Sequence, residues 1–216
     1  MTHLRSRRAP IVFAAAAVLA LVAAACAGSP DAAPAGTTAP SANNHGTNCP
    51  TSQPAALGAG ETRTVELTTS LGVITLKIQG DLSPIAAGNF VALASCGYYD
   101  GVVFHRVVPG FVIQGGDPTG TGRGGPGYTI QDELVTTTYH RGTLAMARST
   151  TPNSQGSQFF IVLDDGAARA LASANTYAIF GEVSGSMDAV DAIAAAADAE
   201  LPSQPIAVTK VIVTNP

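Results

Sequence analysis

The sequence predicts a mainly β protein in which a closed antiparallel β-barrel is capped by two α-helices. Gly and Pro are abundant, at 23 and 14 of 216 residues, which suits a turn-rich β protein. Short apolar segments with strand-like alternation recur along the chain and are separated by glycine-rich loops. Two segments carry the signals of helices, and helices in such a protein cover the ends of a barrel.

The predicted strands begin with a hairpin. Ser70-Leu71-Gly72 stands between Thr64–Thr68 and Val73–Ile78, and apolar residues alternate in both flanking segments. The other strands are expected at Val102–His105, Val112–Gly115, Tyr128–Ile130, Thr143–Ala147, Gln158–Leu163, Ala178–Val183 and Ile206–Val213.

The two predicted helices begin at recognisable residues. Ser83 is a good N-cap and Pro84 suits the first helical position, so a helix is expected to begin there. Gly97 would end this helix, since glycine adopts the left-handed conformation that follows many helices. The second helix is expected over Met187–Ala197, where apolar residues recur at helical spacing.

Residues 1–25 are typical of a signal peptide. Arg5, Arg7 and Arg8 form a basic start, and the apolar run Ile11–Ala25 is shorter than the roughly 20 residues that a membrane span needs. Cys26 directly follows small residues, which is similar to a bacterial lipoprotein signal and predicts that Cys26 carries a lipid. An ordinary secretory signal and an uncleaved anchor are the alternatives.

Residues 26–61 are interpreted as the lipid-anchor cysteine and a disordered linker, followed by a folded domain over residues 62–216. The linker consists almost entirely of Ala, Pro, Gly, Ser, Thr and Asn, which bury too little apolar surface to fold. Export would place Cys49 and Cys96 in an oxidising compartment, which permits a disulfide worth roughly 3–4 kcal/mol. Two unpaired thiols are the alternative.

The composition argues against several classes of function. The formal net charge is −4, and removal of the signal peptide leaves 8 basic and 15 acidic residues without a basic stripe, so no nucleic-acid partner is expected. The four histidines have no metal-ligand spacing with cysteines or acids, so neither a metal nor another cofactor is expected. Ser157 has no evident base partner, and no nucleophile elbow occurs, which argues against a hydrolase.

The candidate site residues are polar or aromatic side chains within apolar, strand-like sequence. Arg106 and Gln114 are costly to bury without a partner or a function, so they point to an apolar pocket with a few polar groups. Taken alone, Arg106 would more often face solvent. Phe111 and Phe160 are candidates for the pocket wall, whereas Phe159 should lie in the core, because adjacent strand residues point to opposite faces.

From about Val65 to Val213 the chain resembles the cyclophilin family of peptidyl-prolyl cis-trans isomerases. The most specific matches are Phe104-His105-Arg106 with Pro109–Asp117, and the run Asn153–Phe160. The resemblance implies an eight-stranded barrel and an enzyme that accelerates rotation about X-Pro bonds without a cofactor. It also implies that proline-containing peptides are the partners. We expect a monomer. Together with the signal peptide, the resemblance leads us to expect that it acts on exported proteins and is lipid-anchored outside the cytoplasm or else secreted.

The same resemblance implies roles for individual residues. Arg106 matches the catalytic arginine, Gln114 matches the polar group beside it, and Phe111 matches an aromatic wall of the proline pocket. The residues implied to bind substrate are Val112, Gly122, Ala147, Arg148, Ser149, Gln158, Phe160, Leu171 and Tyr177.

Three departures from the family pattern bear on activity. Arg148 replaces a common asparagine, the usual tryptophan near Leu171 is absent, and the stretch Asp164–Asn175 is longer than expected. Arg148 and the altered loop keep one alternative open, a cyclophilin-like module that binds proline segments or unfolded chains with little catalysis. A second alternative is a lipoprotein whose pocket binds a small solute.

Overall fold

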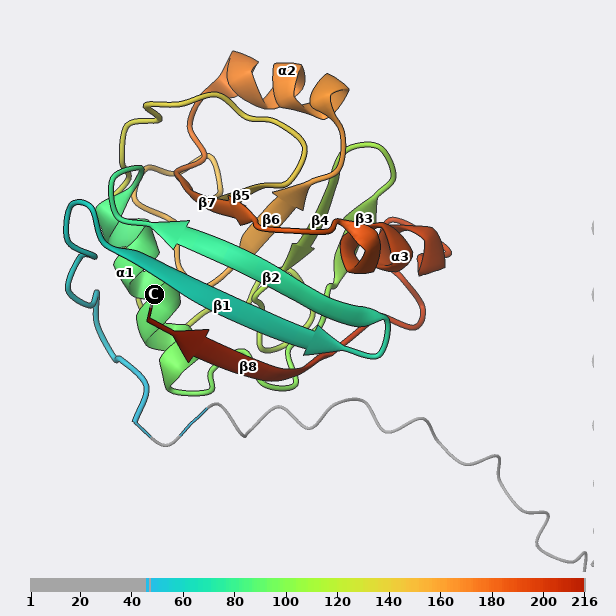
Figure 1. Cartoon of the computed structure of the whole chain (residues 1–216), viewed down its shortest axis with the longest axis horizontal. Coiled ribbons are helices and arrows are strands. Elements are labelled where there is room, and N and C mark those ends of the chain that lie inside the picture. Colours follow the sequence, from blue (N-terminus) through green and yellow to red (C-terminus); the bar gives the residue numbers. More distant parts are fainter. Residues whose placement is uncertain (1–45, 47, 216) are drawn as a thin grey trace, which may run out of the picture. The chain divides into compact units, whose positions relative to one another are not determined.

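The computed structural model describes residue 46 and residues 48–215, so the predicted signal peptide and Cys26 lie outside the described residues. Eight strands form one antiparallel sheet in the order β3-β4-β6-β5-β7-β2-β1-β8 (Figure 1). The strands are β1 Thr62–Thr69, β2 Gly72–Gln79, β3 Arg106–Val108, β4 Val112–Gly115, β5 Thr143–Met146, β6 Phe159–Val162, β7 Ile179–Val183 and β8 Val208–Thr214. The helices are α1 Pro84–Ser95, α2 Asp165–Ala174 and α3 Asp188–Ala196.

The sheet curves into an open barrel, which confirms the eight antiparallel strands but not the predicted closure. The edge strands β3 and β8 are not paired with each other. An isolated bridge between Val103 and Ala207 connects the segments that lead into them. Farther along β3, the N–H of Val107 donates to the carbonyl of Glu200 at 2.8 Å. A loop therefore occupies the outer edge of β3 where closure would need β8.

The helices differ from the sequence prediction by one element. Helices α1 and α3 lie where they are expected. Helix α2 was not predicted: it lies in the stretch Asp164–Asn175, which the sequence analysis noted only as longer than expected. Its signals are local: the Asp164 carboxylate accepts from the N–H of Gly166, and Asn175 ends the helix in the left-handed conformation. Among residues 46 and 48–215, no helix is both long and apolar enough to cross a membrane. The strand expected at Tyr128–Ile130 is reduced to one bridge, between Ile130 and Gln155.

Apolar side chains pack on both faces of the central strands. On β6, Phe159 and Ile161 belong to the main core with α1, whereas Phe160 and Val162 point to a second cluster that includes α2. Every residue of β5 and β6 is buried, so neither strand shows the polar alternation of a strand with one wet face. The second cluster is Val112, Tyr139, Ala145, Phe160, Val162, Ala167, Ala168, Leu171 and Ile179.

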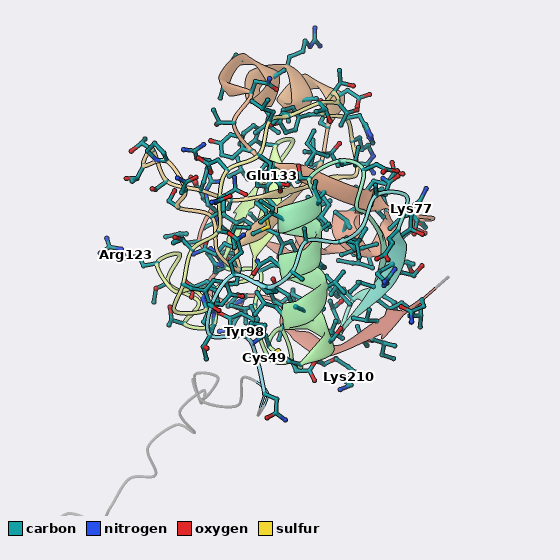
Figure 2. The ribbon with its side chains drawn as sticks, turned by 90° about the vertical axis from the view of Figure 1, so that its left-hand side faces the viewer. Cys49, Lys77, Tyr98, Arg123, Glu133 and Lys210 are labelled. Carbon is teal, nitrogen blue, oxygen red and sulfur yellow. A yellow bond between two sulfur atoms is a disulfide. The ribbon has the colours of Figure 1, made fainter. Side chains whose placement is uncertain are left out.

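A carboxylate from a distant loop caps α1. The Glu133 oxygens accept hydrogen bonds from the N–H groups of Ile85 and Ala86 at 2.9 and 2.8 Å. Figure 2 shows Glu133 at this end of the helix. The Ser83 hydroxyl makes no capping bond, although the sequence predicted it as the N-cap. The Glu133 carboxylate caps the helix in place of Ser83, since it accepts two hydrogen bonds at the positive end of the helix dipole.

The segment before β1 lies against α1. The structure joins Cys49 to Cys96, at the end of α1, with a Cα–Cα distance of 5.2 Å, and Figure 2 shows Cys49 near that end. Farther along, Leu57 is buried and its N–H donates to the carbonyl of Pro84 at 2.9 Å. The folded part therefore reaches back at least to Cys49, ahead of the predicted boundary at residue 62. A bridge across 47 residues contributes about 4 kcal/mol in the chain-entropy description.

We predict that Glu133→Ala lowers the free energy of unfolding by about 1–2 kcal/mol, because two N–H groups of α1 lose their acceptor. The matched change Ser83→Ala should leave stability nearly unchanged, since the buried Ser83 hydroxyl lacks a hydrogen-bond partner. Chemical unfolding curves of the two variants measure this difference. An equal loss in both would contradict the assignment of the cap.

Candidate active site

A pocket of about 220 Å³ opens on the face of the sheet that carries the second apolar cluster. Strands β3, β4 and β6 supply one side of the pocket, and α2 supplies another through Leu171. The lining residues are Arg106, Phe111, Val112, Gln114, Ala147, Arg148, Phe160, Leu171 and Tyr177. All nine were expected at the substrate site from sequence, and the structure brings them to one place.

The strand register explains how residues so far apart in sequence meet. Arg106 on β3 is the register partner of Gln114 on β4, Gln114 is the partner of Phe160 on β6, and Phe160 is the partner of Ala145 on β5. Directly opposed residues in a sheet lie on the same face. One row across four strands therefore carries the guanidinium, the amide and the aromatic ring into the pocket.

Glu200, from the loop before β8, contacts Arg106. The Arg106 side chain is about one-third exposed, at 32%, and its Nε donates to Glu200 Oε1 at 2.7 Å. Gln114, the register partner of Arg106 on β4, bonds to a different residue. Gln114 Nε2 instead donates to Gln158 Oε1 at 2.9 Å, and Gln158 Nε2 donates to the carbonyl of Gly124 at 2.9 Å. The two glutamines thus tie β4 and β6 to the glycine-rich loop.

The aromatic part of the pocket wall, formed by Phe160 and Tyr177, is held in place by Tyr139. Tyr177 meets Phe160 edge to face, with ring centroids 5.4 Å apart. The Tyr139 hydroxyl donates to the carbonyl of Tyr177 at 2.8 Å and accepts from its N–H at 3.2 Å. Burial raises the pKa of Tyr139 to about 12, so the hydroxyl stays protonated and able to donate. These bonds fix the Tyr177 backbone and, with it, the position of the wall.

A second hollow of about 210 Å³ continues the pocket, because the two share Gln114, Ala147 and Arg148. It adds the remaining residues that were expected to bind substrate, and two others: Gly122, Ser149, Ser154, Gly156 and Gln158. Gly122 has φ of +80°, a conformation that favours glycine. The two hollows together form one continuous groove.

Arg148 is held within its own loop by Asp132. Its Nη1 pairs with the Asp132 carboxylate at 3.0 Å, and its Nε and Nη2 donate to the carbonyls of Ser149 and Thr151 at 3.2 and 3.1 Å. The Arg148 side chain is only 11% exposed. Asp132 also accepts from the N–H of Asn153 at 2.8 Å. The arginine that replaces an asparagine thus shapes the rim of the groove, and its charge is compensated.

Two buried polar residues, Ser157 and His105, lie near the site. The Ser157 hydroxyl is buried and donates to the carbonyl of Gly116 at 2.6 Å, so it is not poised as a nucleophile. Gly116 has φ of +88°, and a Cβ there would lie 2.2 Å from the carbonyl oxygen of Ser157.

Burial lowers the pKa of His105, so its ring is neutral at pH 7. Within the part of the chain that is described, no three His, Cys, Asp or Glu residues are grouped to hold a metal.

The site is thus an apolar pocket with a guanidinium at its wall, continued by a groove. The chain matches the family described as cyclophilin type peptidyl-prolyl cis-trans isomerase/CLD over residues 64–213. It belongs to this family of isomerase enzymes, which confirms the enzyme class expected from sequence at the level of the family.

Individual relatives agree with this assignment. The chain is 53% identical over 104 residues to peptidyl-prolyl cis-trans isomerase ppi1 of Schizosaccharomyces pombe, across 46% of this chain and 66% of the relative. It is 46% identical over 132 residues to CYP18-1 of Arabidopsis thaliana, across 59% and 79%. A putative bifunctional phosphatase/isomerase of Streptococcus pyogenes is matched over 22% of its length. The chain thus spans less than two thirds of some curated relatives.

The fold agrees with solved structures of the family. The crystal structure of a Cryptosporidium parvum cyclophilin type isomerase superimposes with a TM-score of 0.63 at 32% identity, covering 72% of this chain and 99% of that one. The same Cryptosporidium parvum protein has been solved in the presence of the dipeptide Ala-Pro, and that structure superimposes with a TM-score of 0.63.

The sequence did not identify Glu200, Asp132, Tyr139, Ser154 and Gly156 as parts of the site. Ser154 and Gly156 lie inside the segment Asn153–Phe160 that carries the family resemblance, so the motif contained a signal for them. Glu200 lies 94 residues from Arg106 and Asp132 lies 21 residues from Asn153, and neither is part of a motif.

We predict that Asp132→Ala lowers the free energy of unfolding by about 2 kcal/mol and speeds amide exchange over residues 148–155. The reason is that the Arg148 guanidinium and the Asn153 N–H lose a common acceptor. Hydrogen–deuterium exchange and chemical unfolding measure the two effects. The control is Arg123→Ala, because Arg123 extends away from the ribbon in Figure 2. Unchanged exchange in Asp132→Ala would show that the loop does not depend on this carboxylate.

Proposed function

We propose that the protein accelerates cis-trans rotation about X-Pro bonds in exported or cell-envelope proteins, acting as a monomer. The single observation that carries the proposal is the row of Arg106, Gln114 and Phe160 across the wall of a pocket of about 220 Å³. The row places a strong hydrogen-bond donor beside an apolar space that suits a proline ring. The adjoining groove offers room for the residues before proline.

The chemistry to be accelerated is a rotation in which no covalent bond breaks. Resonance gives the peptide C–N bond partial double-bond character and a rotation barrier of about 18–20 kcal/mol. In the half-rotated state the resonance is lost, and the proline nitrogen regains a lone pair. A donor that binds this lone pair stabilises the transition state more than either planar isomer, which is the requirement for catalysis.

Arg106 is the residue placed to donate that bond. Its Nε is engaged by Glu200, so the Nη groups remain for the pocket. Phe111, Phe160 and Leu171 hold the ring by apolar contact, while the carbonyl end of the X-Pro bond rotates. Gln114 is restrained by Gln158 and provides a fixed polar surface beside the rotating bond.

We predict that Arg106→Ala reduces kcat/KM for a proline-containing test peptide at least tenfold, while the domain stays folded because the side chain is partly exposed. NMR exchange spectroscopy on cis and trans peptide signals measures the rate directly. Arg123→Ala is the control, since it removes an exposed arginine outside the pocket. Turnover of Arg106→Ala at the wild-type level would contradict the role of the guanidinium. Peptide binding without acceleration by the wild type would favour the binding module.

We place this activity outside the cytoplasm, on a lipid anchor at Cys26. The run Ala23–Ala25 before Cys26 supports a lipoprotein signal, and the basic residues near the start support export. The disulfide between Cys49 and Cys96 supports the same location, because disulfides persist in oxidising compartments and are rare in the cytosol.

We predict that the wild-type chain incorporates labelled fatty acid and fractionates with membranes, whereas Cys26→Ser does neither, because the thiol that would carry the lipid is gone. Ser41→Ala, in the same segment, is the control and should behave like the wild type. Wild-type protein that carries no label and accumulates in the culture medium would instead identify an ordinary secretory signal.

A further inference from the structure

We infer that Glu200 is a positioning residue of the isomerase site, whose carboxylate sets the orientation of the Arg106 guanidinium; this inference rests on the proposed function. The evidence is the contact that Glu200 makes across the open edge of the barrel. Its Oε1 lies 2.7 Å from Arg106 Nε, within the range of charge-assisted hydrogen bonds.

The loop that carries Glu200 is fixed independently of its carboxylate. The backbone carbonyl of Glu200 accepts from the N–H of Val107, the residue after Arg106, at 2.8 Å. Asp198 accepts from the backbone N–H of Ser203 at 2.9 Å and from its hydroxyl, which closes the loop around Glu200. The hydrogen bonds from the hydroxyl and the N–H of Ser203 lower the pKa of Asp198, so this acceptor stays charged at neutral pH. Truncation of the Glu200 side chain should therefore leave the loop in place.

The direction of the contact decides which donors face the substrate. A guanidinium has five N–H donors in a rigid plane, and only one of them belongs to Nε. With Nε bound to the loop, the plane is held at its Nε edge and the Nη groups are left for the pocket that contains Phe111 and Phe160. A donor aimed in advance at the half-rotated bond has less conformational freedom to lose during the reaction.

The contribution of Glu200 comes from orientation more than from charge attraction. The side chains of Arg106 and Glu200 are 32% and 59% exposed, and salt screens the attraction between such groups. Glutamine has an oxygen at the same position as glutamate and can accept the same bond without the charge. Aspartate is one methylene shorter and cannot reach Nε from the same backbone position. Glu200→Gln and Glu200→Asp therefore separate the hydrogen bond from the charge.

The chain offers a matched control for an exposed Glu–Arg pair. Glu61 pairs with Arg63 at 3.0 Å, with side-chain exposures of 50% and 24%, and neither residue lines the pocket. If Glu200 acted only as one more surface ion pair, Glu61→Ala and Glu200→Ala would have the same effect.

The test is the isomerisation rate of a proline-containing peptide by the Glu200 variants. We expect Glu200→Ala to lower kcat about fivefold with little change in KM, Glu200→Asp to behave similarly, and Glu200→Gln to keep most of the rate. Glu61→Ala should match the wild type. In the Arg106→Ala background, Glu200→Ala should cause no further loss, because two residues that act through one contact are not additive. Wild-type kcat in Glu200→Ala, or the same loss with and without Arg106, would overturn the inference.

A second readout separates this inference from the proposed function. The Nε–H NMR signal of Arg106 in the free protein should exchange slowly with water in the wild type and in Glu200→Gln, and rapidly in Glu200→Ala. If the wild type does not isomerise proline peptides, the proposed function fails, yet this signal still reports whether Glu200 holds Arg106. Equal exchange in all three proteins would overturn the positioning role whatever the activity.

Discussion

The candidate site depends on the register of four short strands. Arg106, Gln114, Phe160 and Ala145 are successive partners across β3, β4, β6 and β5, so they share one face of the sheet. A slip of one residue in any of these strands would turn its side chains to the opposite face, because side chains alternate along a strand. The main core opposes such a slip, since Phe159 and Ile161 would have to leave it. The packing that stabilises the domain thus also aligns its functional groups.

Because both faces of the central strands are buried, the sequence of these strands gives little indication of which face carries the site. Every residue of β5 and β6 is buried and all but Thr143 are apolar, so an alternation of polar and apolar residues does not mark which face carries the site. The polar groups that distinguish the site come from the ends of strands and from loops. Gln158 connects Gln114 to the glycine-rich loop, and Asp132 connects Arg148 to the segment Asn153–Phe160. The groove therefore has a base of buried apolar strand residues and edges formed by loops that hydrogen bonds hold together.

The sequence predicted those parts of the fold whose signals are local. The strand Val112–Gly115 and the start of α1 at Pro84 were expected where the structure has them, because apolar alternation and proline at a helix start act over a few residues. Alternation also separated Phe159 from Phe160 correctly. Helix α2 was missed since its apolar face is small, with Ala167, Ala168 and Leu171 as its buried residues.

The features that the sequence did not predict depend on contacts between distant segments. Glu133 caps α1 from 48 residues away, and Glu200 reaches Arg106 from 94 residues away. A single acidic residue in a loop belongs to no repeating sequence pattern, so the donor that it binds can be identified only from the folded structure. The open edge between β3 and β8 has the same origin, because the carbonyl of Glu200 takes the amide that a neighbouring strand would need.

The disulfide also determines how the domain would carry mechanical load. A tensile force on the backbone ahead of Cys49 passes through the sulfur atoms to Cys96 and bypasses the segment between the two cysteines, which are 47 positions apart in the sequence. That segment contains β1, β2 and α1, so the hairpin cannot be peeled from the sheet by a pull from the N-terminal side. Reduction of the bond would redirect the same force into β1, an inner strand paired on both sides.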